Sequence, residues 1–269
     1  GHSDLSRRLT EYQMSGLSFR EFMCMMTGVN IEPIELSSLL NSPNLFCQEV
    51  KRHFHPLEYF HLYLKEGYYP FYFENKKMYH NVIENVINYI VDNELTMFRG
   101  LEVGNSRRIK ALLQVLSKMV PYEVDISKLS RTIGIQRPTT LKYLKNLEEA
   151  ALIRRLFTKI DTITDLQKPD KILIDNSNIL YTLSDSNPEI GTVRETFFCN
   201  QLCAAGHIVE YGGLKTGDFR IDKEIVIEVG GSDKGLKQIQ NEEYGYVAAD
   251  DIDNAIFRKI PLWAFGFLY

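Results

Sequence analysis

The sequence predicts an α+β chain made of several modules, with helices in its first half and an α/β domain at its C-terminal end. Residues 79–93 and 107–119 each repeat apolar positions at helical spacing. Residues 125–150 contain two short helical patterns separated by Gly134. Residues 225–230 form an apolar strand that follows a glycine-containing turn. These patterns predict a helical segment, a compact helix pair and a domain built on a sheet.

Composition sets broad limits. The chain has 269 residues, of which 44% are hydrophobic and 25% are charged. That length allows two or three compact modules, and no apolar run is long enough to span a bilayer. The four cysteines contain no C-x-x-C pair, and Cys199 and Cys203 lie one helical turn apart, where small buried thiols are common. We therefore expect a reduced, cytoplasmic protein without a membrane partner. Residues 1–3 resemble an expression scar, which suggests a piece of a longer protein.

The first third predicts short helices and little chemistry. Ser18 is placed to cap a helix, and Glu21, three residues later, completes a capping box. A break rich in Pro and Asn follows at residues 32–44, and residues 57–64 predict a helix that ends at Gly67. Three histidines lie close together in the sequence here: His53, His55 and His61. Their spacing does not match a closed zinc site, so we expect no metal there.

Residues 125–160 have the pattern of a winged helix-turn-helix. A short helix over 125–133 is followed by a turn at Gly134, and Pro138 suits the first turn of a second helix. Residues 152–160 then alternate as a wing strand would. The segment 121–160 holds eight Lys or Arg against four acids, as a DNA-binding module would. The residues expected to contact double-stranded DNA are Arg137, Thr139, Thr140, Lys142, Tyr143 and Lys145.

The C-terminal part carries acidic residues in a nuclease-like order. Glu195 lies on a predicted helix that ends at Gly206, Asp218 lies in the turn before a strand, and Glu228 lies within the strand 225–230. Two carboxylates are what a hard divalent cation needs in a metal-dependent phosphodiesterase, so Asp218 and Glu228 are the candidate metal ligands. The simpler alternative is that Glu228 caps a strand and Asp218 serves a turn.

This order resembles the PD-(D/E)XK nuclease superfamily, in which a lysine follows the strand glutamate by two residues. Here Gly230 stands at that position, and Lys234 and Lys237 are the candidates to replace the lysine. Residues 185–255 hold fourteen acids against six bases, which disfavours binding of a phosphate backbone. We therefore expect a degenerate, inactive site with Glu195, Asp218 and Glu228 in the catalytic positions. A Q-x-x-x-Y element, Gln240 and Tyr244, keeps the nuclease alternative open.

The chain as a whole resembles the C-terminal part of prokaryotic AAA-type ATPases that carry an appended domain of unknown function. The segments that carry this resemblance are 17–22, 63–70, 125–160, 171–175 and 261–269. No G-x-x-x-x-G-K-[ST] phosphate-binding loop occurs in the chain. The resemblance implies that ATP and Mg²⁺ belong to an ATPase core elsewhere in the parent protein, and that no cofactor is needed here. It also makes Arg7 and Arg8 candidates for an arginine finger, against the simpler alternative of a solvated charged pair.

The full prediction is a helical N-terminal segment, a winged helix-turn-helix and a PD-(D/E)XK nuclease-like α/β domain. The expected boundaries are 1–44 for the end of the ATPase core, 45–120 for the helical segment, 121–160 for the winged helix and 161–269 for the last domain. The predicted function is recognition of DNA, or of a partner such as the ATPase core or other subunits. The alternatives are a metal-dependent DNA nuclease and a protein-interaction module that binds no nucleic acid.

Overall fold

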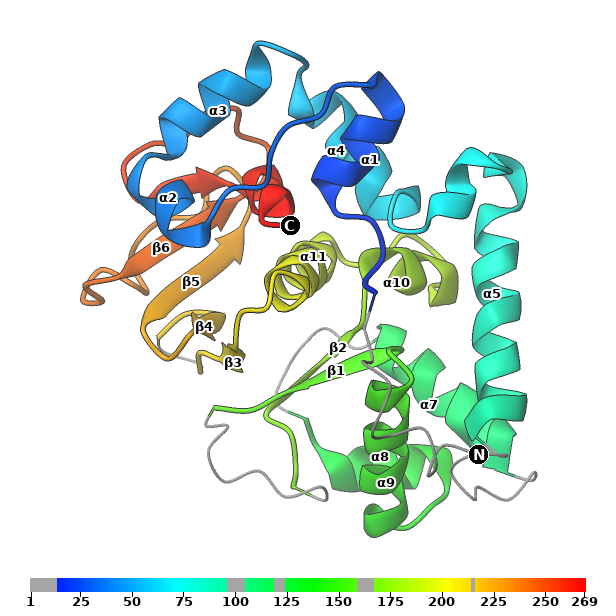
Figure 1. The fold of residues 1–269 in the computed structure, drawn as a ribbon. Coiled ribbons are helices and arrows are strands. Elements are labelled where there is room, and N and C mark those ends of the chain that lie inside the picture. The colour runs from blue at the N-terminus through cyan, green and yellow to red at the C-terminus, as the bar shows by residue number, and fades with distance from the viewer. Residues whose placement is uncertain (1–13, 96–104, 119–123, 159–166, 214–215) are drawn as a thin grey trace, which may run out of the picture.

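The computed structural model describes residues 14–95, 105–118, 124–158, 167–213 and 216–269. It shows a mixed α and β fold, with a helical N-terminal part and a C-terminal part that contains the larger sheet (Figure 1). None of the helices in these residues combines the length and the apolar composition that a membrane-spanning helix needs.

The first helices pack against the last residues of the chain. Helix α1 places Phe19 between Phe60 of α4 and Phe267 of the C-terminal 3₁₀ helix η5, with ring centroids 5.2 and 5.7 Å away. Gly266 permits this approach, because a β-carbon there would lie 2.5 Å from the β-carbon of Phe19. Figure 1 shows α1 beside the C-terminus. The helices are α1 (Phe19–Thr27), α2 (Leu36–Asn41), α3 (Pro43–Lys51), α4 (Pro56–Glu66) and η5 (Leu262–Phe267).

The local signals of this part are confirmed. Ser18 and Glu21 form the predicted capping box at the start of α1. Helix α3 begins at Pro43, which suits a first helical turn, so the predicted boundary between residues 44 and 45 lies inside this helix. Residues 14–54 are therefore built into the C-terminal part: Phe46 contacts Trp263 and Phe267, and the Lys51 side chain donates a hydrogen bond to Asn254.

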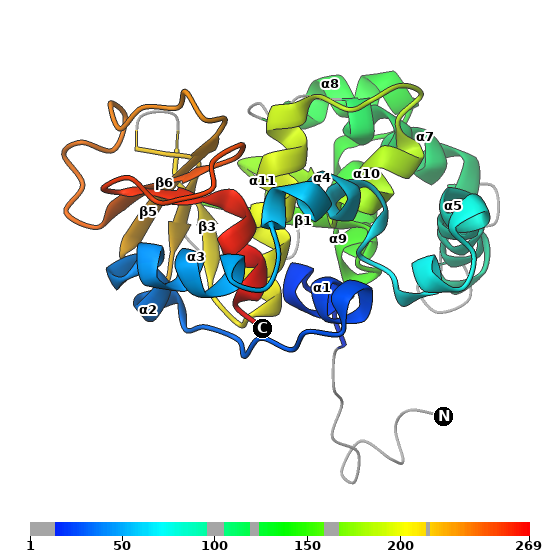
Figure 2. The ribbon, with the colours of Figure 1, turned by 90° about the horizontal axis from the view of Figure 1, so that it is seen from above.

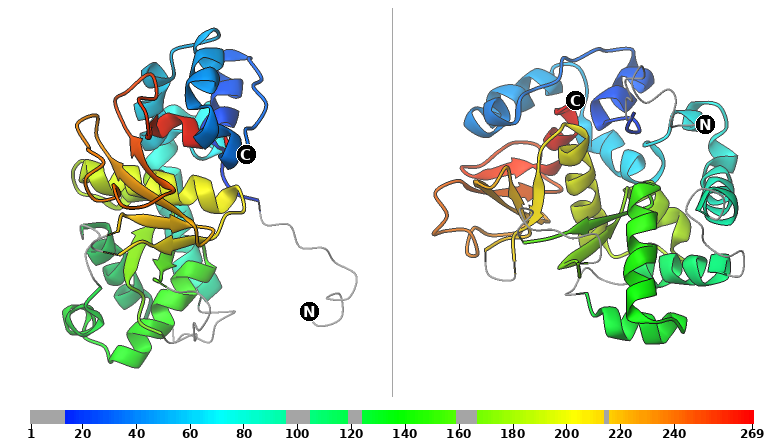
Figure 3. Two further views of the ribbon diagram at one scale, coloured as in Figure 1. Left: turned by 90° about the vertical axis from the view of Figure 1, so that its left-hand side faces the viewer. Right: turned by 60° about the horizontal axis from the view of Figure 1, so that its bottom comes forward.

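The middle of the chain, from α5 to β2, forms a second lobe. Helix α5 runs from the first lobe, which contains α1 to α4 and η5, down to the helices α7, α8 and α9 (Figures 1 and 3). Helix α8 is capped by Asp125 and ends at Gly134 in the left-handed conformation, with φ +68°, and Pro138 lies in the first turn of α9, both as predicted. The elements are α5 (Tyr79–Tyr89), the π turn η3 (Ile90–Glu94), α7 (Ser106–Lys118), α8 (Ile126–Ile133), α9 (Arg137–Glu149), β1 (Ile153–Leu156) and β2 (Lys171–Ile174).

This lobe also contains a two-stranded antiparallel sheet. Strand β1 pairs with β2, with Ile153 opposite Ile174 and Leu156 opposite Lys171. The resemblance implied that residues 171–175 open the last domain, but this strand pairs with β1, the strand that follows α9. The predicted boundary between residues 160 and 161 therefore separates two strands that are hydrogen-bonded to each other.

The C-terminal part contains a five-stranded mixed sheet with the order β3-β4-β5-β6-β7. Strands β3 to β5 are antiparallel, and β5, β6 and β7 are parallel. Helix α11 lies beside this sheet (Figure 2), and its Phe198 packs on Phe219 of β4, with ring centroids 5.3 Å apart. The elements are α10 (Ser177–Leu183), α11 (Ile190–Ala204), β3 (Val209–Tyr211), β4 (Phe219–Ile221), β5 (Ile225–Gly230), β6 (Gly245–Ala249) and β7 (Lys259–Pro261).

A buried polar residue joins the helical segment to the C-terminal part. Asn178 of α10 accepts a hydrogen bond from the Tyr68 N–H and donates to the carbonyl oxygens of Tyr63 and Leu64, over 2.9 to 3.1 Å. It also binds the Tyr79 hydroxyl. Because buried polar groups are costly when unpaired, this set of bonds fixes the register of α4 and α5 against α10.

Candidate functional site

Three acidic side chains that are distant in sequence meet beside strand β5. Glu195 comes from α11, Asp218 directly precedes β4, and Glu228 lies within β5, where it is buried. The Asp218 carboxylate accepts a hydrogen bond of 2.8 Å from the Val229 N–H, which holds it next to the residue that carries the second carboxylate. The three acids that the sequence analysis singled out thus lie in one site.

The side chain of Lys234 takes the space that Gly230 leaves open. A β-carbon on Gly230 would lie only 2.8 Å from Cβ, Cγ and Cδ of Lys234. From there the Lys234 ammonium reaches Glu228, with 2.5 Å between Nζ and Oε1. An ammonium therefore stands beside the strand glutamate although the strand position is glycine, whereas Lys237 is exposed.

A second lysine comes from the two-stranded sheet β1–β2. Lys171, at the start of β2, lies 2.7 Å from Glu195, measured from Nζ to Oε2, and its side chain is only 4% exposed. Its ammonium also lies over the Phe219 ring, 5.0 Å from the centroid. We call Lys171, Glu195, Asp218, Glu228 and Lys234 the carboxylate–lysine cluster. Sequence reasoning missed Lys171. Its position at the edge of the apolar stretch 171–174 is a signal, because a lysine that is buried with such a strand needs an acidic partner.

The pKa values of the cluster reflect burial and like charge. Burial raises the pKa of Glu195 to about 7, with Lys171 opposing the shift and Asp218 adding to it. Burial and the Asp218 charge also raise the pKa of Glu228, although Lys234 acts against the shift. Burial alone would lower the pKa of Lys234, but Glu228 and the other two acids outweigh it and raise that pKa. Lys234 is therefore a cation at neutral pH and not a proton acceptor.

The cluster has the donor chemistry for a hard divalent cation. Carboxylate oxygens are the ligands that Mg²⁺ and Mn²⁺ prefer. Oxygen Oε2 of Glu228 is buried and has no hydrogen-bond partner among the described residues. A buried acceptor of this kind is rare, and a bound cation would satisfy it. Asp218 and Glu228, the two ligands expected from the sequence, carry oxygens of this class.

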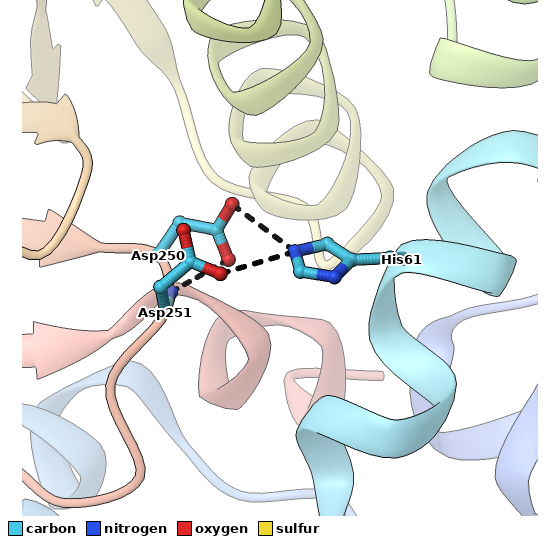
Figure 4. Close-up of side chains that lie close together, drawn as sticks. All are labelled: His61, Asp250 and Asp251. Carbon is cyan, nitrogen blue, oxygen red and sulfur yellow. Dashed lines mark hydrogen bonds and ion pairs between the residues drawn. The ribbon is translucent and has the colours of Figure 1, made fainter.

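A second acidic group lies where α4, α11 and the end of β6 meet. Nε2 of His61 is 3.6 Å from Asp250 and 3.3 Å from Asp251 (Figure 4). Among the described residues, His61, Asp250 and Asp251 form the one group of at least three His, Cys, Asp or Glu side chains whose possible ligand atoms all lie within 4.8 Å of one another. Arg194 already pairs with both carboxylates, over 2.8 and 3.1 Å. A metal ion would have to compete with this guanidinium, so we interpret the group as a clamp between three elements.

The residues predicted to contact DNA separate into two sets. Arg137 and Lys142 are exposed and Thr139 is half-buried. Thr140 is instead buried, with its hydroxyl 2.7 Å from that of Ser130 on α8. Tyr143 is 2% exposed and belongs to the core.

Lys145 is half-buried and lies 3.6 Å from Glu149. Thr140 and Tyr143 are therefore corrected from DNA contacts to packing residues, because they lie on the same helix face as Leu144 and Leu147.

The remaining predicted residues add little. Arg7 and Arg8 lie outside the described residues, as does the end of the predicted wing strand, residues 159–160. Gln240 and Tyr244 are both exposed.

Comparison with known proteins gives one match. Residues 57–189 match the model of a family described as a domain of unknown function, DUF8612. No curated protein and no solved structure matches the chain significantly. The matched range runs from α4 to Glu189, the residue before α11, so it includes the β1–β2 sheet and Lys171 but ends before Glu195.

Proposed function

We propose that this chain is a DNA-acting region in which the carboxylate–lysine cluster hydrolyses phosphodiester bonds with a divalent cation. The observation that carries the proposal is the position of Lys234 over Gly230, beside Glu228. The inactive site expected from the sequence depended on the acidic composition of residues 185–255 and on the missing strand lysine. A lysine that reaches Glu228 from the following loop removes the second of these objections, and this supports a PD-(D/E)XK-type site.

Each residue of the cluster has a role that its surroundings support. Asp218 and Glu228 would hold the cation, which polarises a phosphoryl oxygen and lowers the pKa of a bound water. Lys234, protonated and 33% exposed, would stabilise the negative charge that develops on the phosphate. Glu195 is paired with Lys171, so it is held in place next to the two ligands rather than free to rotate.

A cleavage assay tests this proposal. Labelled duplex and single-stranded DNA are incubated with the protein and Mg²⁺, Mn²⁺ or Ca²⁺, beside Glu228→Gln, Lys234→Gln and the exposed control Lys237→Gln. We expect cleavage that requires Mg²⁺ or Mn²⁺, a loss of at least about a hundredfold in the first two variants, and full activity in the control. Intact DNA under all conditions, with purified protein that is folded, would refute catalysis and favour the inactive site.

Metal binding is measured separately by titration calorimetry with Mn²⁺. Binding that weakens in Glu228→Gln but not in Lys237→Gln supports the assignment of the ligands. If Mn²⁺ binds and no DNA is cut, the cluster holds a cation without hydrolysing DNA. If neither occurs, the cluster is a buried ion-pair network that stabilises the fold.

A second function, binding of duplex DNA by the helix-turn-helix, is favoured by the outer face of this module. Arg131, Arg137 and Lys142 are all exposed on α8 and α9, and the wing strand β1 follows in the order of a winged helix. Such exposed cations bind phosphates and make affinity fall with salt.

Fluorescence anisotropy of a labelled duplex tests this function at several salt concentrations. Arg137→Ala/Lys142→Ala is compared with Lys77→Ala/Lys237→Ala, which removes the same charge from exposed positions elsewhere. Loss of affinity and a salt slope reduced by about 2 in the first variant alone would support groove binding. Equal effects in both variants would contradict it.

The resemblance to AAA-type ATPases supports placing this region after an ATP-hydrolysing core. In that arrangement the core binds ATP and Mg²⁺, and this region recognises DNA or a neighbouring subunit. Adding the ATPase core to the chain and measuring ATP hydrolysis with and without duplex DNA tests the link. Hydrolysis that does not respond to DNA, to Arg137→Ala or to deletion of the winged helix would contradict it.

A further inference from the structure

Helix α5 has two apolar faces, and one of them is buried against the rest of the described chain. Tyr79, Ile83 and Ile87 form the buried face, and α5 packs against α10. One apolar face is what a helix at the surface of a globular protein needs, because its other side is solvated. Figures 1 and 2 show α5 at the outer edge of the molecule.

The second apolar face of α5 is exposed. Its residues recur at positions i, i+4, i+8 and i+11, so they form one line along the helix and its N-cap. Met78 and Val86 are each 48% exposed, Tyr89 is 60% exposed and Val82 is half-buried. We call Met78, Val82, Val86 and Tyr89 the α5 stripe. Single exposed apolar side chains are common on protein surfaces, but a continuous row of them marks an interaction site.

The border of the α5 stripe is polar, and opposite charges lie at its two ends. Lys77 directly precedes the stripe and Glu94 follows it, and both are exposed. Asp92, also at the second end, is already paired with Lys110 over 2.7 Å. The exposed asparagines beside the stripe are Asn81 and Asn85. An apolar centre without charges and a polar border are the usual anatomy of a protein–protein interface.

The α5 stripe is complementary to itself when a second copy is turned end for end. In an antiparallel pair of α5 helices related by a two-fold axis, Lys77 lies opposite Glu94 of the second copy, and this pairing occurs twice. The same register places the small Val82 opposite the large Tyr89 of the second copy, because Lys77 is five residues before Val82 and Glu94 is five residues after Tyr89. A parallel pair would instead place like charges against each other.

We propose that α5 is a self-association surface through which two copies of this chain form an antiparallel, two-fold symmetric dimer. The α5 stripe of one copy is covered by the α5 stripe of the other. The surface takes no part in the carboxylate–lysine cluster or in the residues predicted to contact DNA, so the dimer does not depend on the proposed function. An interface built on one helix per copy lies near the lower limit of stable contacts, about 1,000 Å² in total, and we expect a dissociation constant on the order of 10–100 µM.

Sedimentation velocity of the whole chain, at concentrations that bracket this constant, tests the dimer. Val86 lies near the two-fold axis, so Val86→Lys brings two like charges together there and should weaken the dimer at least about tenfold. Because Val86 is 48% exposed, the new lysine reaches solvent in the monomer, and circular dichroism checks that the variant is folded. Leu45→Lys is the matched control, since Leu45 is 71% exposed on α3 and gains the same charge. It should leave the affinity unchanged.

Charge reversal tests the antiparallel order. Lys77→Glu and Glu94→Lys each place like charges at both ends of the dimer and should weaken it about fivefold. The double variant Lys77→Glu/Glu94→Lys should recover the native affinity, and a mixture of the two single variants should form heterodimers in preference to either homodimer. A chain that stays monomeric at every concentration would overturn the proposal and leave the stripe to a different partner. A dimer that a folded Val86→Lys protein retains, or a double variant as weak as the single ones, would also overturn it.

Discussion

Replacing Lys234 by methionine isolates the ion pair at the centre of the carboxylate–lysine cluster. Methionine keeps the length of the side chain and removes its charge. Glu228 has only 2% of its side chain exposed, so it would be left as a buried carboxylate without its partner. Breaking a buried ion pair in this way costs about 3–5 kcal/mol if the remaining charge stays ionised.

Protonation sets an upper limit to that cost. An unfolded glutamate has a pKa of about 4.3. Keeping the buried Glu228 carboxyl protonated in the folded variant therefore costs about 1.4 kcal/mol for each pH unit above about 4.3. Lys234→Met should therefore lower the free energy of unfolding by at most about 4 kcal/mol at pH 7 and about 1 kcal/mol at pH 5. Because Lys234 is 33% exposed, we expect a loss of about 2–3 kcal/mol at pH 7.

The direction of the pH dependence follows from the sign of the shift. In the variant the folded pKa of Glu228 lies above its unfolded value, so the folded state holds a proton that the unfolded state has lost. The stability of the variant therefore falls as the pH rises from about 4.3 through the folded pKa of Glu228.

Urea denaturation at pH 5 and pH 7 measures both values, with Lys237→Met as the exposed control. An effect of Lys234→Met that equals the control, or that does not change with pH, would show that Lys234 is not paired with a buried carboxylate.

Three further predictions concern stability. The Asp250 carboxylate, 3.6 Å from Nε2, raises the pKa of His61, although burial opposes the shift. This contact therefore stabilises the fold fully below about pH 6.5, and its contribution is lost as the pH rises through the folded pKa of His61. His61→Gln should be destabilising in urea at about pH 6 and neutral at about pH 9. Asn178→Ala leaves several buried backbone groups unpaired and should cost about 2–4 kcal/mol in the same assay; less than 1 kcal/mol would contradict the hydrogen bonds assigned to it. Thr140→Val leaves the buried Ser130 hydroxyl with one partner fewer, so it should lower the free energy of unfolding by about 1–2 kcal/mol without changing DNA affinity. Weaker DNA binding by a folded Thr140→Val protein would return Thr140 to the DNA-contacting residues.

Local signals allowed much of the secondary structure to be predicted. The capping box at Ser18, the left-handed Gly134 and Pro138 in a first helical turn depend on neighbouring residues only, and each is confirmed. Helix α11, the helix predicted to carry Glu195, begins at Ile190, because the Glu189 side chain caps it by accepting a hydrogen bond from the Thr192 N–H. Helix ends are set by such single contacts, which periodicity does not contain.

Long-range pairing was not accessible in the same way. The sequence of strand β2 is an isolated apolar run, and nothing in residues 171–174 specifies that its partner is β1. The face of α9 was also misjudged at Thr140 and Tyr143, because the buried face of this helix is wider than the Leu141, Leu144 and Leu147 stripe alone. In both cases tertiary packing decided what local pattern left open.

The candidate site shows why a motif read along one strand is incomplete. The proposed hydrolysis requires an ammonium near Glu228, but the lysine that supplies it need not stand two residues after that glutamate. A lysine on the loop after the strand can reach Glu228 only if the residue at position 230 is small. Gly230 meets that condition, since any β-carbon there would collide with Lys234. The glycine that argued against catalysis is thus the residue that makes room for the replacement. Lys171 extends the same point, because it lies on β2, which pairs with β1, and its ammonium contacts Glu195. A change in the position of the β1–β2 sheet would therefore move a charge that pairs with Glu195. This contact is a physical route by which the proposed DNA binding would act on the carboxylate–lysine cluster.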